Sequence, residues 1–346
     1  MVASWGRNAL WVKGEIFRNL DEVTLISRGA LDRASQISMF DRLEWFRRTY
    51  LLTKLPGQPL ITRARAVASD CWLFLTQRGS AGKALASWYT LSFRPVFTGD
   101  PNDATKFALL LATARRLTKR LSTIKLSPMP QHDAKIVAKA FDRARWMPFV
   151  REATANWTVE TDGMSFADYW AQRPGELRST VKRKAVKYEI ETQIFTTFDT
   201  EAWASYETIY SASWKPEEGS TEFLRDMALN ESAVGALRIG VATISGEAVA
   251  AQLWTVENGR AIIHKLAYLE SAAAQSPGSV LTAAMFEHVI DKDRARIVDF
   301  GLGDDRYKAD WMDRREPLYT VELFNPRRPA GLWGAIKTWL TTLVGR

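Results

Sequence analysis

The chain has 346 residues, a mass of 39.1 kDa and a formal net charge of +8. Its composition, 46% hydrophobic and 25% charged, excludes a disordered or collagen-like protein, and its length favours about two domains. The positive charge favours anionic partners such as phosphorylated cofactors, nucleic acid or an anionic bilayer. The single cysteine, Cys71, excludes an internal disulfide.

The apolar runs of the sequence are all short. The longest, residues 107–112, falls far below the roughly 18 residues that a membrane span needs. The N-terminal residues lack an apolar core that ends in a small-residue cleavage site, so no signal peptide is predicted. We therefore expect a cytoplasmic protein, with peripheral contact at the inner membrane as an option.

Helical and strand patterns alternate along the first half. Apolar residues at helical spacing predict a helix near 39–46, whereas residues 1–65 show no strong strand signal. Strands over 71–76 and 84–93 flank a glycine-containing turn, and a third strand reaches Phe97. The elements expected next are a helix over 104–122, a strand over 123–127, a helix over 133–145 and a strand over 157–161.

The second half follows a similar order. Its expected elements are a helix over 165–171, a basic segment over 173–187, a strand over 190–195, helices over 203–214 and 222–228, strands over 236–244, 247–256 and 260–268, a helix over 279–291, and strands over 296–301 and 318–324. We predict an α+β fold of two similar lobes, 1–162 and 163–326, each a mixed, mostly antiparallel sheet flanked by helices. Residues 327–346 form a tail. One larger mixed domain is the alternative.

The stretch 260–311 carries the clearest chemical signal. A strand leads into a small-residue loop over 271–279, and that loop opens a helix. Free backbone N–H groups and the positive dipole end at a helix N-terminus suit a phosphate or pyrophosphate. Gly278 would let a ligand approach the backbone closely. A turn that binds nothing is the alternative.

This order of three antiparallel strands, glycine loop, helix, strand and tyrosine-bearing segment is similar to that of the GNAT acyltransferases. Residues 275–280 (QSPGSV) resemble their pyrophosphate loop, with Val280 in place of a small residue. Residues 299–311 (DFGLGDDRYKADW), together with Ser276-Pro277-Gly278 and Trp214-Lys215, resemble the CelD-type (BioF-like) branch. That branch is related to the two-lobed Fem-type aminoacyltransferases. The resemblance covers roughly residues 150–325.

The resemblance implies an acyl-CoA site in the splay between the strand before the loop and the strand after the helix. A backbone N–H would polarise the thioester carbonyl, and the acceptor would attack directly, without a covalent enzyme intermediate. The residues implied to contact CoA are Tyr268, Gln275, Ser276, Pro277, Gly278, Ser279 and Val280. Trp214, Lys215 and Trp311 are implied to contact the acceptor.

His264 is the candidate general base, because an imidazole with a pKa of about 6.5 suits proton removal near neutrality. Strand alternation would place it on one face with Ile262, Leu266 and Tyr268. A core or interface histidine with one hydrogen bond is the alternative. His132 and His288 lie on helix patterns, so we interpret them as structural.

Tyr307 is the candidate acid for the leaving thiolate, with packing or acceptor binding as the alternative. Asp304, Asp305 and Lys308 are further polar candidates. Asp304 would orient Lys308 or His264, or cap the turn after Gly303. We interpret Cys71 as a small buried hydrophobe. Three scattered histidines and one cysteine show no metal-ligand spacing, so no metal is predicted.

Two segments suit anionic surfaces. The stretch 173–188 carries one acid, Glu176, among six basic residues, namely Arg173, Arg178, Lys182, Arg183, Lys184 and Lys187. A solvated helix face, the 3′-phosphate of CoA and an anionic surface would each explain it, whereas no nucleic-acid-binding motif is present.

The second segment is the tail, where apolar residues at 332, 333, 336, 339, 340 and 343 form one helical stripe. Trp333 and Trp339 with flanking basic residues are typical of an interfacial helix. Docking on the body or on a dimer partner is the alternative. The stretches Leu10-Trp11-Val12 and Trp45-Phe46 would extend an apolar surface or lie in the core.

The resemblance and these segments together predict an acyl-CoA-dependent N-acyltransferase at the cytoplasmic membrane face. Within this broad branch bacterial ceramide synthases acylate a long-chain base, and a basic, tryptophan-rich chain favours such an amphiphilic acceptor. O-acetylation of an exopolysaccharide or its lipid-linked precursor, aminoacyl transfer from tRNA and a non-catalytic GNAT-like binding module are the alternatives. The expected partners are acyl-CoA and an acceptor that carries an amine or a hydroxyl.

Overall fold

The computed structural model describes residues 13–344, without the side chains of 342–344. The stretch Leu10-Trp11-Val12 therefore lies outside the described residues. The chain divides into two compact units: unit 1 combines residues up to Thr154 with those from Pro317 onward, and unit 2 is Ala155–Glu316. The sequence analysis placed this boundary after residue 162 and separated 327–346 as a tail.

Unit 1 consists of a mixed sheet, five α-helices and the 3₁₀ helix η1 (Met39–Asp41) in its described part. Its strands are ordered β1-β2-β3-β4-β6-β13, and β5 pairs with β3. The elements are β1 (Lys13–Phe17), α1 (Leu20–Ser27), α2 (Leu43–Leu52), β2 (Gln58–Arg65), β3 (Asp70–Arg78), β4 (Ala81–Ala84), β5 (Val96–Thr98), α3 (Asp103–Thr118), β6 (Thr123–Pro130), α4 (Gln131–Arg143), most of β13 (Arg314–Phe324) and α10 (Pro329–Val344).

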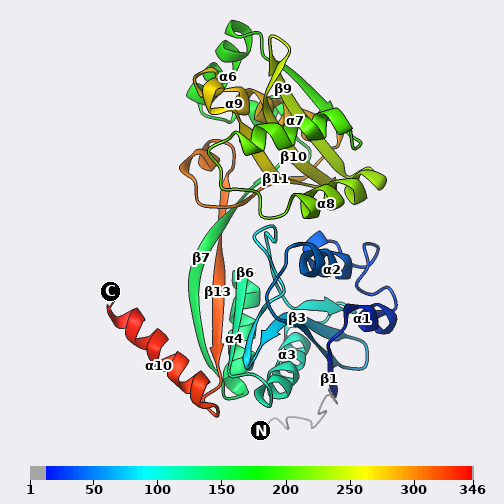
Figure 1. Cartoon of the computed structure of the whole chain (residues 1–346), viewed down its shortest axis with the longest axis vertical. Coiled ribbons are helices and arrows are strands. Elements are labelled where there is room, and N and C mark those ends of the chain that lie inside the picture. Colours follow the sequence, from blue (N-terminus) through cyan, green and yellow to red (C-terminus); the bar gives the residue numbers. More distant parts are fainter. Residues whose placement is uncertain (1–12, 345–346) are drawn as a thin grey trace, which may run out of the picture. The chain divides into compact units, whose positions relative to one another are not determined.

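Unit 2 has a sheet ordered β7-β12-β11-β10-β9-β8, of which Figure 1 labels β7, β9, β10 and β11. Its elements are the end of β7 (Met147–Glu160), α5 (Phe166–Ala171), α6 (Gly175–Lys187), β8 (Glu191–Phe195), α7 (Thr200–Ser211), α8 (Thr221–Ala233), β9 (Leu237–Ile244), β10 (Glu247–Glu257), β11 (Arg260–Tyr268), the 3₁₀ helix η2 (Glu270–Gln275), α9 (Pro277–Glu287), the π-helix η3 (His288–Lys292), β12 (Ile297–Leu302) and the 3₁₀ helix η4 (Arg306–Asp310).

Apart from the short β5 of unit 1, both units repeat one order of elements: strand, two helices, three strands, a helix, and a strand that pairs in parallel with the third of those strands. The parallel pairs are β4 with β6 and β11 with β12. One further strand of each sheet is supplied by the chain segment that follows the repeat of the other unit. β7, which follows α4, pairs with β12 of unit 2, and β13, which follows η4, pairs with β6 of unit 1. This exchange puts the unit boundaries inside β7 and β13.

The core of unit 2 explains why α9 and α7 lie where they do. On one face of the sheet, Phe286 of α9 packs edge-on against Trp254 of β10, with ring centroids 5.5 Å apart. Gly240 of β9 leaves room there for Met285, whose sulfur would lie 2.6 Å from an added Cβ. On the other face, Lys265 of β11 lies 5.1 Å from the ring of Tyr210 in α7. The sheet is therefore covered on both faces.

Two predictions about unit 1 are wrong. Residues 1–65 include β1 and β2, which pair in antiparallel register; Pro59 and Arg63 obscure the apolar pattern of β2, yet Arg63 is buried because it pairs with Asp70. The predicted strand over 84–93 ends as β4 at Ala84, and the buried side chains that follow fill the core from an irregular segment. Within residues 13–344, none of the helices combines the length and apolarity needed to cross a membrane.

Candidate functional site

The central feature of the site is an opening between two parallel strands of unit 2. β11 and β12 pair only where Arg260 to Ile262 face Ile297 to Asp299. Beyond that point β11 continues to Tyr268 with β10 as its partner, while Leu302 of β12 pairs with β7. The edge of β11 beyond Ile262 therefore offers backbone N–H and C=O groups to an extended ligand.

The N-terminus of α9 lies directly after β11 and η2. Ser276 adopts a left-handed conformation (φ 57°) before Pro277 at the first helical position, and no side chain caps this end. The first turn contains no acidic residue. Gly278 packs under Tyr268, since an added Cβ would lie 3.1 Å from the ring. These backbone N–H groups and the helix dipole suit a phosphate.

The equivalent helix of unit 1, α3, begins in a different way. The side chain of Asn102 accepts a hydrogen bond from the backbone N–H of Thr105, and Asp103 stands in the first turn. A side-chain cap and a negative charge thus occupy the position that α9 leaves open to an anion. This difference between the two repeats points to unit 2 as the place for a phosphorylated ligand.

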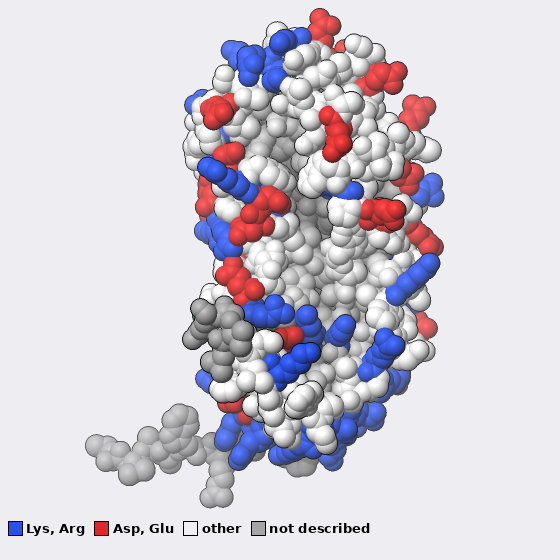
Figure 2. Space-filling view, turned by 60° about the vertical axis from the view of Figure 1, so that its left-hand side comes forward, with Lys and Arg blue, Asp and Glu red and all other residues white. Residues whose placement is uncertain are grey.

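Helix α6 brings basic side chains to the loop before α9. Lys184 donates a hydrogen bond to the carbonyl of Ala274 in η2, and α6 has no buried residue. Figure 2 shows Lys and Arg side chains gathered at the end of unit 2 where Figure 1 places α6. Arg173, which precedes α6, is instead buried and pairs with Asp313 at 2.7 Å. The basic charge beside the loop therefore belongs to α6 itself.

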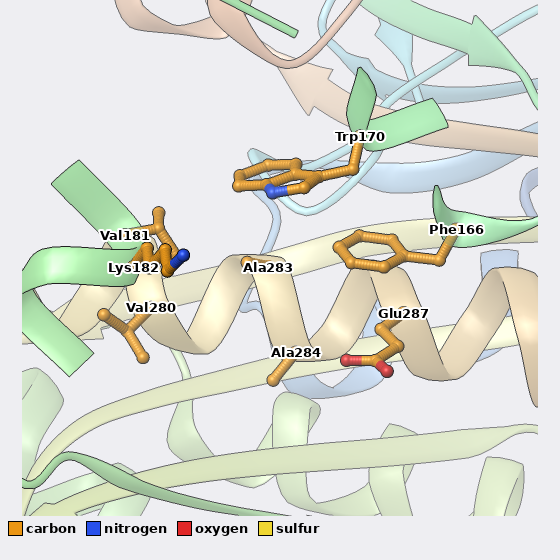
Figure 3. Close-up of a pocket in the computed structure, with 8 residues that line it drawn as sticks. All are labelled: Phe166, Trp170, Val181, Lys182, Val280, Ala283, Ala284 and Glu287. Carbon is orange, nitrogen blue, oxygen red and sulfur yellow. The ribbon is translucent and has the colours of Figure 1, made fainter. Parts of the chain in front are cut away.

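A surface hollow of about 340 Å³ lies between α5, α6 and α9. Figure 3 shows the rings of Phe166 and Trp170 over α9, with Lys182 and Glu287 toward opposite ends. The full lining is Phe166, Trp170, Val181, Lys182, Val280, Ala283, Ala284 and Glu287. Val280 therefore directs its side chain into this hollow between the helices.

His264 occupies a β-bulge, and the predicted strand alternation is wrong at this point. Trp254 pairs with Ile263 and Leu253 with Lys265, so His264 is the extra residue. The bulge reverses the alternation, which puts Leu266 and Tyr268 on the opposite face from His264. Nε2 of His264 lies 2.8 Å from the hydroxyl oxygen of Thr255.

The protonation of His264 also departs from the expectation. Burial, with a smaller contribution from the Lys265 ammonium, lowers the pKa of His264 to about 3. The imidazole is therefore neutral near pH 7, and it accepts a proton only weakly.

A buried ion pair lies beside His264 on the face covered by α7. Lys265 Nζ is 2.8 Å from Glu218 Oε1, and their side chains are 10% and 7% exposed. Tyr206 donates a hydrogen bond to the other oxygen of Glu218 at 3.1 Å. Burial lowers the pKa of Lys265, while Glu218 raises it. Two elements far apart in sequence, β11 and the loop after α7, thus meet at this pair.

Lys215 lies close enough to this pair for their charges to interact. Burial and the positive charges of Lys265 and Lys308 lower the pKa of Lys215 to about 8, against the attraction of Asp305 and Glu218. Its ammonium lies 5.8 Å from the ring of Trp214, which is 60% exposed. We refer to Lys215, Glu218 and Lys265 as the lysine cluster. Within this cluster, the Lys215 amine gains or loses its proton close to physiological pH.

Tyr307 lies on η4, and its ring packs edge-on against Phe300 at 5.7 Å. The side chain remains 44% exposed. Burial and the neighbouring Asp305 and Tyr268 raise the pKa of Tyr307 to about 12. The hydroxyl therefore keeps its proton at neutral pH and can donate it. The same interactions place Tyr307 near Tyr268 and hence near the start of α9.

Lys308 is 3% exposed and is directed at the end of β12. Its Nζ donates to the carbonyls of Leu302 at 2.6 Å and Gly301 at 3.3 Å. Burial lowers its pKa to about 8. Asp304 forms two hydrogen bonds with Arg315, at 2.8 and 2.7 Å, and the hydrogen bonds hold its pKa below the usual range. Both residues therefore shape the loop between β12 and η4.

Two further predicted residues lie in cores. Trp311 is 4% exposed and stacks on Phe286 with centroids 5.4 Å apart, which leaves no face for an acceptor. Cys71 is fully buried in β3, and burial raises the pKa of its thiol. Across residues 13–344, no group of three or more His, Cys, Asp or Glu side chains is placed to hold a metal ion.

The sequence analysis did not single out Lys265, Glu218 or Tyr206. One signal was present, since Lys265 is a charge inside an otherwise apolar strand pattern directly after His264. Glu218 follows Lys215 in a loop, where sequence alone gives no indication of burial. Only the packing of β11 under α7 brings them together.

Comparison with known families identifies the part of the chain that carries this site. Residues 175–309 match the family model described as acetyltransferase (GNAT) domain. The chain has the GNAT-superfamily fold. The matched GNAT region runs from α6 to η4 and thus includes the opening between β11 and β12, the start of α9 and the lysine cluster.

Solved structures resemble this chain over both of its units. The C-terminal domain (DUF2156) of a putative lysylphosphatidylglycerol synthetase from Agrobacterium fabrum has a TM-score of 0.59 at 12% identity, covering 91% of this chain and 95% of that one. FemX has a TM-score of 0.59 at 11% identity, covering 90% and 98%. The L-PGS from Bacillus licheniformis has a TM-score of 0.52 at 11% identity, covering 79% and 85%. A search of curated proteins gives no significant match.

Proposed function

We propose that the GNAT region of unit 2 transfers an acyl group from acyl-CoA to an amine. The observation that carries the proposal is the opening between β11 and β12 directly beside the uncapped, acid-free start of α9. A free strand edge beside an anion-binding helix end supports a donor with an extended arm and a phosphate, which is the chemistry of CoA. The family model supports acyl transfer at the same residues.

In this proposal the donor binds along three elements. The pyrophosphate accepts hydrogen bonds from the backbone N–H groups of Gly278 and Ser279, since that of Val280 already donates to the carbonyl of Ser276, and basic side chains of α6 contact the 3′-phosphate. The pantetheine arm lies along the edge of β11, where a backbone N–H polarises the thioester carbonyl. We also propose that Tyr268, Gln275 and Ser276 contact CoA, as the resemblance implies.

The chemistry is a direct acyl transfer. The acceptor nitrogen attacks the carbonyl carbon, a C–N bond forms, the C–S bond breaks, and the amine loses a proton. We assign the proton acceptor to Lys215, because a pKa of about 8 leaves part of its amine neutral near that pH, whereas His264 is too weakly basic. Tyr307 gives its proton to the leaving thiolate.

The acceptor in this proposal is an amphiphilic amine. The exposed ring of Trp214 beside Lys215 offers an apolar platform next to the proton acceptor. A long-chain base, which would yield a ceramide-like amide, fits this description and the expected peripheral location at the inner membrane. O-acetylation of an exopolysaccharide is the competing acceptor chemistry, and it requires acetyl-CoA without a long chain.

A second candidate donor is aminoacyl-tRNA. The observation that favours it is the basic helix α6, which carries more positive charges (Arg178, Lys182, Arg183, Lys184 and Lys187) than one 3′-phosphate requires. The affinity of a polyanion bound there would fall steeply with added salt, whereas the affinity for CoA, which has only three phosphate groups, would fall less steeply.

The test is thiol release by the purified full chain with acyl-CoA from acetyl to palmitoyl and a panel of amines. We expect an N-acylated product by mass spectrometry, and tighter binding of longer chains by up to about 0.8 kcal/mol per buried methylene. Lys215→Met and Tyr307→Phe should each lower kcat by about 100-fold or more. The control Lys135→Met changes an exposed lysine of unit 1 and should leave kcat unchanged.

Three outcomes would overturn parts of the proposal. Turnover confined to acetyl-CoA and hydroxyl acceptors would favour polysaccharide acetylation. Salt-sensitive tRNA binding with no thiol release would favour the aminoacyl donor. If the chain neither turns over nor binds either donor, the remaining interpretation is a non-catalytic binding module.

A further inference from the structure

Helix α10 packs on unit 1 with the face that carries its small residues. Gly331 and Ala335 are buried, and Gly334 is partly buried. An added Cβ at Gly331 would lie 2.2 Å from the carbonyl oxygen of Asn325, and one at Gly334 would lie 2.7 Å from the ring of Phe324. These distances leave no space for a larger side chain, so the orientation of α10 about its own axis is fixed.

The opposite face of α10 is a stripe of large apolar side chains exposed to solvent. The exposed fractions are 44% for Leu332, 70% for Trp333, 41% for Ile336, 56% for Trp339 and 50% for Leu340. We refer to these residues as the apolar stripe. A helix that stabilises the body of a protein directs such residues inward, whereas α10 directs them outward. The described part of the helix contains no acidic residue.

A cluster of basic residues lies where α10 begins. Arg328, just before α10, donates a hydrogen bond to the carbonyl of Lys119, the residue that caps the C-terminal end of α3. Arg115, Arg116, Lys119 and Arg120 of that region are exposed, as is Arg327. Figure 2 shows Lys and Arg side chains crowded at the end of unit 1 where Figure 1 places the start of α10.

We propose that α10 binds the surface of an anionic lipid bilayer. The apolar stripe enters the boundary between headgroups and acyl chains, where the amphipathic indoles of Trp333 and Trp339 are favoured. The basic cluster contacts lipid phosphates. Charge complementarity supports the bilayer, because α10 carries no acidic residue and begins beside the basic cluster, whose positive charges attract anionic headgroups. The proposal is independent of the acyl-transfer chemistry.

The test measures co-flotation of the full chain with vesicles. One set contains phosphatidylglycerol mixed with phosphatidylcholine, and the other contains phosphatidylcholine alone. We expect binding to the anionic vesicles to be stronger by about tenfold or more, since each basic residue near the surface adds to the attraction. The preference should fall in the double variant Arg327→Gln/Lys337→Gln, which removes one exposed positive charge before α10 and one on the helix itself.

Two matched variants separate the stripe from general surface hydrophobicity. Trp333→Ser/Trp339→Ser should lower the affinity for anionic vesicles by about tenfold or more, because each indole buries a large apolar area. Leu25→Ser/Val67→Ser removes apolar residues that are 79% and 99% exposed elsewhere on unit 1 and should bind like the unmodified chain. All four positions face solvent, so the melting temperature should be unchanged.

Equal affinity of the unmodified chain and of Trp333→Ser/Trp339→Ser for anionic vesicles would overturn the proposal. The absence of binding to anionic vesicles would overturn it as well. If light scattering instead shows a dimer that Trp333→Ser/Trp339→Ser dissociates, a second copy covers the stripe and the bilayer assignment is wrong.

Discussion

The buried ion pair of the lysine cluster allows a quantitative prediction. Lys265 and Glu218 lie 2.8 Å apart with side chains at most 10% exposed, so replacing either one leaves a buried charge without its partner. Lys265→Met should lower the free energy of unfolding by about 3–5 kcal/mol. Glu218→Gln should cost a similar amount, because the hydrogen bond from Tyr206 is weakened as well.

The double variant Lys265→Met/Glu218→Gln provides the decisive comparison. Because it removes both charges, its destabilisation should be smaller than the sum of the single effects by about 2 kcal/mol or more, measured by urea unfolding. Additivity within about 0.5 kcal/mol would refute the claim that the pair is desolvated. Lys135→Met, at an exposed lysine, is the control and should change the unfolding free energy by less than about 0.5 kcal/mol.

Three further predictions follow from burial and close contact. Trp311→Ala should lower the unfolding free energy by about 3–5 kcal/mol in a denaturant titration, because the ring is buried against Phe286; a loss below about 1 kcal/mol would place Trp311 outside the core. Gly331→Ala should loosen α10 and speed its removal by protease, since the methyl group would meet the carbonyl of Asn325; an unchanged rate would contradict the packing. Lys308 has a pKa of about 8 in the folded state and of about 10.4 in the unfolded state, so the unfolded state binds more protons between these pH values. The free energy of unfolding should therefore rise over that pH window by up to about 3 kcal/mol relative to Lys308→Met. Parallel curves of unfolding free energy against pH for the two proteins would refute this.

The sequence predicts much of unit 2 because its strands are bounded by clear turns. Ser245-Gly246 and Asn258-Gly259 separate β9, β10 and β11 at nearly the predicted residues, and Gly246 and Gly259 do adopt positive φ. A helix does follow β11 as the resemblance implies, but the predicted loop over 271–279 is wrong: these residues form the 3₁₀ helix η2 and the first turn of α9, which includes Gly278. The correctly predicted turns depend on local conformation, which neighbouring residues determine.

Features that depend on long-range pairing were not predictable in this way. The bulge at His264 arises from the register between β10 and β11, so strand alternation assigned the residue to the wrong neighbours. The exchange of β7 and β13 involves pairing across more than one hundred positions and moves the domain boundaries. Trp311 illustrates the same limit, because a tryptophan near a site motif does not reveal whether it faces a ligand or the core.

The central claim is that the start of α9 binds the phosphates of the donor. Calorimetric titration with acetyl-CoA tests it with the pair Ser279→Glu and Ser279→Gln, which differ in charge and little in shape. The glutamate should stabilise α9, because a negative charge suits a helix N-terminus, yet weaken acetyl-CoA binding by about tenfold or more through repulsion of the pyrophosphate. The glutamine variant carries any effect of side-chain size without the charge, so it should bind acetyl-CoA more tightly than the glutamate variant. Equal binding of the glutamate and glutamine variants would contradict a phosphate site at α9.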